Sequence, residues 1–214
     1  MDVHIKVCMC NCKGVNRMYE VTQTYIETVK VGDIPWHRLT TSYGRATDFP
    51  AYLEVLCDMK DVDAVDAAGE ELAQNIEHQS TLWHATPFAL VFLLRIFKKA
   101  VEEQGHNEVA RYLVEELAEL FLIIAECIRD GLMLEHVDPL PNFEDMLKEE
   151  YLWSEEYDED EDIIRYEEEE VFPDDLFFSF YYYSLQVLLL CKPLLDKNNK
   201  YEATLLELLT EIEC

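Results

Sequence analysis

Apolar residues recur every three or four positions between residues 107 and 129, and this spacing is the feature that most constrains the fold. In an α-helix it gathers apolar side chains on one face, which must then be buried against other elements. The apolar positions are Val109, Tyr112, Leu113, Leu117, Leu120, Phe121, Ile124 and Ile128. The other face is mainly charged and carries Glu108, Arg111, Glu115, Glu119 and Glu126. The pattern predicts an amphipathic helix over 107–129.

Helix boundary signals recur along most of the remaining chain. Asp, Asn, Ser and Thr accept hydrogen bonds from the free N–H groups of a first helical turn, where Pro is also favoured, and Gly often ends a helix. Asn199 and Glu202 have the spacing of a capping box. The signals predict helices over 36–43, from 47 or 48 to 59, from 61 or 63 to 76, from 80 or 86 to 101, over 142–153, from 174 or 175 to 190, and over 200–212.

This succession of helices, joined mostly by short links, predicts an all-α fold. It is typical of a bundle or of an α-solenoid made of antiparallel helix pairs. No series of strands supports a parallel sheet. The longest apolar stretch, 176–195, contains Ser, Tyr, Gln, Lys and Pro, so a buried helix fits it better than a membrane span.

The first 32 residues differ from the rest. The stretch 18–31 is rich in Thr, Val, Tyr and Ile, and Tyr19, Val21 and Tyr25 alternate along it, which predicts one or two short strands or an extended arm. We therefore expect an arm over 1–32 and a helical-repeat domain over 33–214. Met18 is an alternative start of the chain.

The chain has 45 acidic and 17 basic side chains in 214 residues, a formal net charge of -28. Such an excess repels the phosphates of nucleic acids and anionic membrane surfaces, so the composition disfavours both as partners and favours a basic protein. Residues 149–175 form an acidic insert with 15 acidic residues and one basic residue, Arg165. Within it we predict partner-binding carboxylates at Glu155, Glu156, Asp158, Glu159, Asp160, Glu161 and Asp162.

An aromatic cluster follows the acidic insert in the sequence. Its members are Phe177, Phe178, Phe180, Tyr181, Tyr182 and Tyr183. Rings beside carboxylates suit a surface that recognises Lys and Arg, since they add cation–π attraction and apolar contact. We predict that Tyr181 and Tyr182 contribute to the partner surface. The alternative is that all six rings lie in the core.

Seven cysteines show no disulfide framework, and the N-terminus lacks a secretory signal, so we expect a reducing cytoplasm. Thiolates and imidazole bind zinc or copper, which makes Cys8, Cys10, Cys12 and His4 a candidate metal site. The C-x2-C spacing usual for zinc is absent, and incidental cysteines in a flexible leader are favoured, so we expect no metal. The other cysteines are expected to be core residues, except an exposed Cys214.

The sequence contains none of the common catalytic or cofactor-binding motifs. G-x-S-x-G, the P-loop, G-x-G-x-x-G and H-E-x-x-H are all absent, and the acidic run lacks the order of an EF-hand loop. General acid–base catalysis needs a carboxyl in a dry pocket, which a solvated acidic run does not supply. We therefore expect a protein that is not an enzyme and has no cofactor.

Hydrogen-bonding side chains are concentrated at Asn75, His78, Gln79 and Thr81. They could line a small polar pocket. The favoured interpretation is that they satisfy the backbone at a helix end, with Ser80 or Thr81 capping the next helix.

Two separated motifs resemble a known family. The first comprises Trp36-His37-Arg38-Leu39, Ser42-Tyr43-Gly44, Ala46, Asp48 and Pro50, and the second comprises residues 75–81 (NIEHQST), Ala85-Thr86 and Pro87-Phe88. Together they resemble bacterial HEAT-repeat-like proteins, over residues 36–97. Ser80 and His84 stand where that family usually has Gly and an acidic residue. The family-motif residues are Trp36, Tyr43, Gly44, Asn75, His78, Gln79 and Thr81.

The resemblance implies a HEAT-like α-solenoid and brings no catalytic residues with it. Some members of the family look like immunity proteins of bacterial toxin systems. Together with the charge, this leads to the hypothesis of a binding module that neutralises a basic, nuclease-like toxin through an acidic surface. The alternative is a structural or regulatory adaptor that binds a peptide or a protein subunit.

Overall fold

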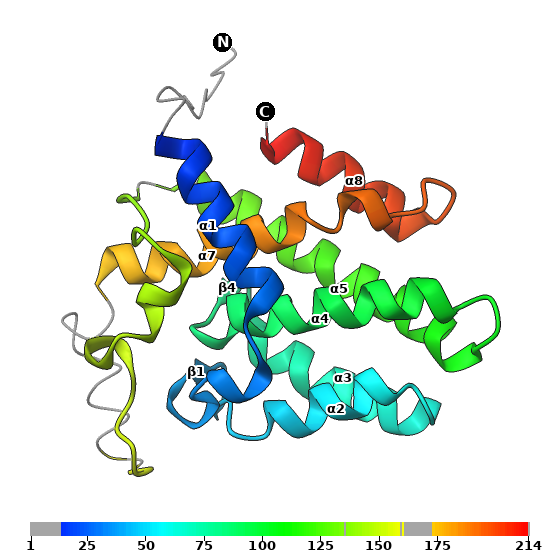
Figure 1. Cartoon of the computed structure of the whole chain (residues 1–214), viewed down its shortest axis with the longest axis horizontal. Helices are drawn as coiled ribbons and strands as arrows, with labels where there is room; N and C mark the ends of the chain where they lie inside the picture. Colours follow the sequence, from blue (N-terminus) through cyan, green and yellow to red (C-terminus); the bar gives the residue numbers. More distant parts are fainter. Residues whose placement is uncertain (1–13, 135, 159, 161–172, 214) are drawn as a thin grey trace.

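The computed structural model describes residues 14–134, 136–158, 160 and 173–213 (Figure 1). Most of these residues are helical, which confirms the predicted all-α class. The helices are α1 Gly14–Thr28, α2 Phe49–Asp58, α3 Val62–Ile76, α4 Ala85–Glu103, α5 Glu108–Leu132, α7 Asp174–Leu189 and α8 Lys200–Glu213. Short 3-10 helices are η1 Val31–Asp33, η2 Trp36–Arg38, η3 Phe143–Leu147, η4 Glu149–Tyr151 and η5 Lys192–Leu194. In the described ranges, no helix has both the length and the apolar character of a membrane span.

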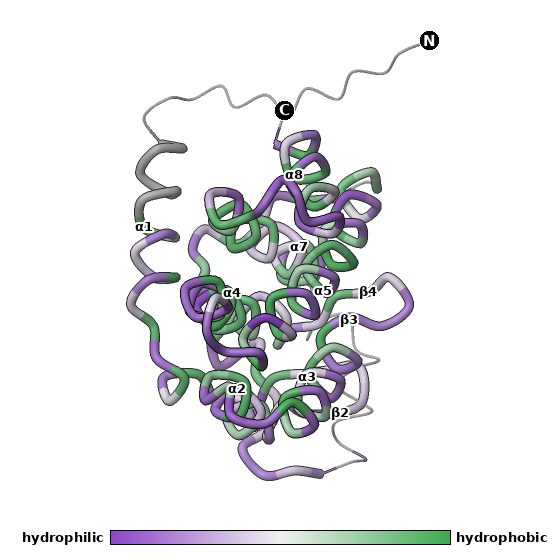
Figure 2. The backbone as a smooth tube through the Cα atoms, turned by 90° about the vertical axis from the view of Figure 1, so that its right-hand side faces the viewer, coloured by the Kyte–Doolittle hydropathy of each residue, from purple (hydrophilic) through white to green (hydrophobic). Residues whose placement is uncertain are grey.

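The long helices pack around one core. Helix α2 packs on α3, α4 packs on α5, and both α7 and α8 pack on α5, while α7 also lies along α4. Figure 2 shows α1 at one edge of the molecule, on the far side of α2 and α4 from α3 and α5. The face formed by α3 and α5 is thus not covered by α1.

Local capping signals fix the starts of three predicted helices. The Asp61 carboxylate accepts a hydrogen bond from Ala64 N at 2.9 Å, and Asn107 Oδ1 accepts from Val109 N at 2.9 Å. Asn199 Oδ1 accepts from Tyr201 N at 3.0 Å and begins α8 as predicted. The capping box itself is not completed, because Glu202 accepts from Asp196 N instead, at 2.7 Å. These caps satisfy N–H groups that lack partners within the helix.

Residues 14–28 form the helix α1, so the prediction of short strands or an extended arm in this stretch was wrong. Thr22, Ile26 and Val29 are buried at helical spacing, and this face of α1 and its C-terminal end pack on the core. The guanidinium of Arg95 on α4 donates to the carbonyls of Val29, at 2.7 Å, and Ile26. Tertiary packing and these C-terminal hydrogen bonds outweigh the β propensity of Thr and Val.

Two other predicted helices are replaced by shorter elements. Residues 36–43 form only the turn η2 followed by the strand β1 Thr40–Thr41. Residues 142–153 form η3 and η4, separated by Lys148 in an extended conformation. Phe143 and Met146 are both buried, and their spacing of three matches a 3-10 helix better than an α-helix.

The core is rich in aromatic rings, and most of the predicted aromatic cluster belongs to it. Phe143 packs against Tyr25 at 5.1 Å, Phe88 at 5.2 Å and Tyr183 at 4.9 Å between ring centroids, which joins α1, α4, η3 and α7. Cys127 and Cys191 are buried as expected, whereas Cys57 is exposed, so its assignment to the core was wrong. Cys214 and the leader cysteines Cys8, Cys10 and Cys12 with His4 lie outside the described residues.

Two helical glycines predict opposite effects of the same substitution. A Cβ at Gly131 would lie 2.7 Å from Cδ1 of the buried Tyr181 ring, whereas a Cβ at Gly69 meets nothing within 4 Å. Overpacking costs about 1–3 kcal/mol, and Ala gains about 1 kcal/mol over Gly in a helix. We expect Gly69→Ala to raise the free energy of unfolding in urea and Gly131→Ala to lower it. A stabilised Gly131→Ala variant would contradict the tight packing of α5 on α7.

Candidate functional site

The two family-motif segments lie side by side as two β-hairpins. The hairpin β1 with β2 Gly44–Arg45 adjoins the hairpin β3 Glu77–His78 with β4 Thr81–Leu82. Ser42 N donates to Asn75 O at 3.1 Å, and Thr41 Oγ1 donates to Asn75 Oδ1 at 2.9 Å. At the surface, Tyr43 Oη lies 3.3 Å from His78 Nδ1. Motifs more than 30 residues apart in the sequence therefore form one structural unit.

The second hairpin corrects the prediction that Ser80 or Thr81 caps the start of the next helix. Gln79 and Ser80 occupy the left-handed region, with φ of 53° and 61°, as in the tight turn of a two-residue hairpin. Helix α4 begins later, at Ala85, and Thr86 Oγ1 lies in its first turn, donating to Ile76 O and accepting from Trp83 N. The motif residue Trp36 is a core residue whose indole donates to Val31 O at 2.8 Å.

The described start of the acidic insert is bound by basic residues of the first motif. The guanidinium of Arg38 makes a bidentate contact with Glu149, at 2.9 and 2.6 Å, and donates to Trp153 O at 2.5 Å. Glu155 lies 3.0 Å from His37 Nε2 and 3.5 Å from Arg38 Nη1. The Glu155 carboxylate, predicted to bind a partner, is thus already paired within the chain.

Arg45 holds the next residues of the insert. Its guanidinium donates to Ser154 O at 2.8 Å and to Glu156 O at 3.4 Å, and it lies over the rings of Trp153 and Tyr157 at 5.4 and 5.3 Å. The side chains of Glu156, Asp158 and Asp160 are exposed, and Glu159, Glu161 and Asp162 lie outside the described residues. The predicted acidic contacts in this segment remain a prediction.

The two predicted tyrosines differ in accessibility. Tyr181 is only 7% exposed, and its hydroxyl accepts a hydrogen bond from Leu82 N at 3.3 Å. Tyr182 is half-buried, and its ring packs edge-on against Tyr183 at 5.1 Å. Of the six rings, Phe177 is the one classed as exposed, at 43%. The aromatic cluster is therefore mainly core, and Tyr181 offers little surface to a partner.

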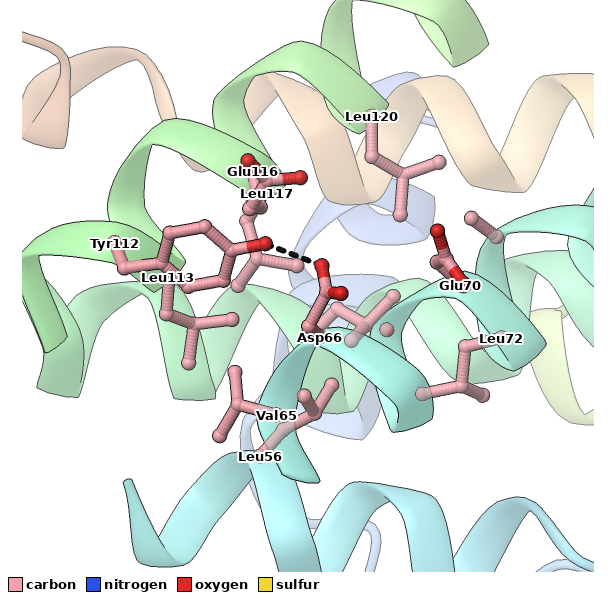
Figure 3. Close-up of a pocket in the computed structure, with 13 residues that line it drawn as sticks. Leu56, Val65, Asp66, Glu70, Leu72, Tyr112, Leu113, Glu116, Leu117 and Leu120 are labelled. Atoms are coloured by element: carbon pink, nitrogen blue, oxygen red, sulfur yellow. Dashed lines mark hydrogen bonds between the residues drawn. The ribbon is translucent and has the colours of Figure 1, made fainter. Parts of the chain in front are cut away.

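A second acidic feature lies in a groove between α3 and α5 (Figure 3). Its volume is about 110 Å³, several times what one water molecule needs. The carboxylates of Asp66 and Glu70 come from α3 and that of Glu116 comes from α5. The remaining lining residues are Leu56, Val65, Gly69, Leu72, Ala73, Leu93, Tyr112, Leu113, Leu117 and Leu120. We call this cavity the α3–α5 groove.

The groove carries uncompensated negative charge. Burial, followed by repulsion from Glu119 and Asp66, raises the pKa of Glu116. The Tyr112 hydroxyl donates to Asp66 Oδ1, and this hydrogen bond is the main reason that the pKa of Tyr112 is raised. Among the described residues, no Lys, Arg or His forms an ion pair with Asp66, Glu70 or Glu116.

Two spacings of four residues in the sequence are the signal for this groove, which the sequence-based prediction missed. Asp66 and Glu70 are four residues apart, as are Tyr112 and Glu116, so each pair lies on one helical face. Their meeting depends on how α3 packs against α5, which the spacing within each helix does not specify. The same carboxylates do not form a metal site: in the part of the chain that the structure describes, no three His, Cys, Asp or Glu side chains converge to hold a metal ion.

Comparison with family models, with curated proteins and with solved structures found no match to this chain.

Proposed function

We propose that this protein is a non-enzymatic binding module that neutralises a basic, nuclease-like bacterial toxin by covering its basic surface. The observation that carries the proposal is the α3–α5 groove, in which carboxylates from two helices surround an apolar floor without a basic partner among the described residues. The three carboxylates are exposed but lie close to one another, and repulsion from Asp66 and Glu70 acts on Glu116. Like charges held close together cost stability, and such costs are typical of sites kept for function.

The charge of the surrounding surface supports the same function. Helix α3 contains four acidic residues and no basic residue. On α5, the exposed Glu115 and Glu119 flank Glu116 and extend the negative surface beyond the groove. A surface of one sign raises the rate at which an oppositely charged partner associates. Nuclease domains carry basic surfaces because they bind phosphates, so an acidic module can compete for the same surface.

The packing of the helices is compatible with a short HEAT-like solenoid. Consecutive helices pair as α2 with α3 and α4 with α5, and the second pair packs on the first through α2–α4 and α3–α5 contacts. Repeat proteins commonly use the surface formed by successive helices of one row to bind a partner. In this proposal, α3 and α5 form that surface.

The proposal predicts that a basic toxin domain is encoded beside this protein and that the two associate rapidly, at a rate that depends on salt. In stopped-flow measurements, we expect the association rate constant to fall about tenfold or more between 50 mM and 500 mM NaCl, since salt screens the attraction. Reversing two charges at the edge of the groove, Glu115→Lys with Glu119→Lys, should slow association with little effect on dissociation.

The matched control reverses two charges outside this face, Glu27→Lys on α1 with Glu54→Lys on α2. Both carboxylates are exposed, so the net charge changes equally without altering the α3–α5 surface. Co-expression with the toxin domain should keep cells alive for the wild-type chain and for the control. Failure of the wild-type chain to protect cells or to bind the domain would refute the proposed function.

A further inference from the structure

We propose that the α3–α5 groove binds the side chain of a single arginine presented by the partner. This inference rests on the proposed function, because it names the group of the partner that the acidic face recognises. The cavity, its apolar floor and its three carboxylates belong to this chain alone, so arginine binding can be tested without the partner.

The floor of the groove suits the hydrocarbon part of an arginine side chain. The half-buried side chains of Tyr112 and Leu120 line the groove together with buried apolar residues. The buried residues are Val65, Leu72, Leu113 and Leu117. Arginine buries its methylene groups on such a surface while its guanidinium stays near polar groups. A hydrated metal ion would gain nothing from this floor.

The carboxylates of the groove suit the guanidinium group of a bound arginine. Figure 3 shows Asp66 between the Tyr112 hydroxyl and Glu70, with Glu116 reaching in from the other wall. A guanidinium is planar and carries five N–H donors, so it can bond carboxylates on two walls at once, whereas an ammonium is a compact point charge that prefers water. Acceptors spread over two helices therefore favour arginine over lysine.

Tyr112 prepares the groove for this ligand. Its hydroxyl donates to Asp66 Oδ1, which orients the carboxylate and leaves Oδ2 as an acceptor. The ring of Tyr112 lines the groove and offers a face for guanidinium stacking. Burial and then repulsion from neighbouring carboxylates raise the pKa of Glu116, and a bound cation would relieve the repulsion.

The test is an NMR titration of the ¹⁵N-labelled full chain with n-butylguanidinium chloride at low salt. We expect saturable shifts of the amides of Gly69, Tyr112 and Glu116, with millimolar affinity. n-Butylammonium should bind about tenfold more weakly, because it lacks the planar fork, and neutral 1-pentanol should leave these amides unshifted. Equal binding of the two cations would overturn the assignment to arginine, and shifts spread over the whole surface would overturn the site.

Matched variants distinguish binding in the groove from attraction to the overall negative charge of the protein. The double variant Glu70→Gln with Glu116→Gln should weaken butylguanidinium binding about tenfold, since two charge-assisted hydrogen bonds are lost. The control, Glu71→Gln with Glu126→Gln, removes the same charge from the same two helices outside the groove lining and should bind like the wild type. The groove variant should also unfold at higher urea, because mutual repulsion is removed, which shows that weak binding does not reflect misfolding.

The same variants distinguish the two proposals. If the groove variant still neutralises the toxin domain with an unchanged dissociation rate, the arginine site is wrong and the proposed function stands. If butylguanidinium binds the groove but the toxin domain does not bind the chain, the proposed function is wrong and the cavity remains an arginine site.

Discussion

Lowering the pH from 7 to 5 should destabilise the wild-type protein by about 2 kcal/mol more than it destabilises the His84→Gln variant. His84 is completely buried, its Nε2–H donates to Met146 O at 2.8 Å, and its ring stacks on Phe180 at 5.1 Å between centroids. Nδ1 has no hydrogen-bond partner among the described residues. Protonation would therefore place a charge and an unsatisfied donor in an apolar site.

The sign follows from the pKa of His84 in the two states. Burial lowers it from 6.5 to about 4 in the folded protein, an effect that the hydrogen bond to the Met146 carbonyl only partly offsets. At pH values between about 4 and 6.5, the unfolded chain binds more protons at His84 than the folded protein does. The stabilising contribution of neutral His84 is thus complete above about pH 6.5 and is lost as the pH falls toward 4.

Urea unfolding of both proteins at pH 7, 6 and 5 measures this contribution. The many carboxylates titrate in both proteins, so their effect cancels in the difference between wild type and variant. Gln keeps an N–H group able to reach Met146 O but does not titrate. A difference that stays constant across this range would show that His84 is not held neutral by its surroundings.

Replacing Arg38 with Met should lower the free energy of unfolding by about 2–3 kcal/mol, because a buried hydrogen bond from a charged donor is lost and its acceptor is left unsatisfied. The Arg38 side chain is 10% exposed and is hydrogen-bonded to Trp153 O and to both carboxylate oxygens of Glu149. Met keeps much of the apolar stem, so the loss reports mainly the hydrogen bonds. Trp153 N also donates to Arg38 O, at 3.1 Å.

The matched control is Arg129→Met, which removes a more exposed pair with the adjacent Asp130. Exposed ion pairs contribute about 0–1 kcal/mol to the free energy of unfolding, so the control should change the urea midpoint little. Hydrogen exchange at the Trp153 amide should accelerate in the Arg38 variant alone. Equal stability of the two variants would show that Arg38 does not anchor the start of the acidic insert.

The arginine contacts also show what the distribution of charge along the sequence does not reveal. The acidic insert stands out in the sequence because its net charge is concentrated. Its described start is contacted by Arg38, Arg45 and His37, which lie more than 100 residues earlier. Charge within a window of sequence does not reveal which carboxylates are already paired. The groove carboxylates Asp66, Glu70 and Glu116 were less conspicuous because they are spread over two helices.

The sequence by itself determined the all-α class, most helix boundaries and the acidic character of the protein. Apolar spacing in α5 and caps such as Asp61 and Asn107 act within a few residues, so they can be read locally. Tertiary structure alone decided that residues 14–28 are helical, that the motif segments form adjacent hairpins, and that carboxylates of α3 and α5 share one groove. These outcomes depend on which faces pack together across long sequence separations, and no local pattern encodes that choice.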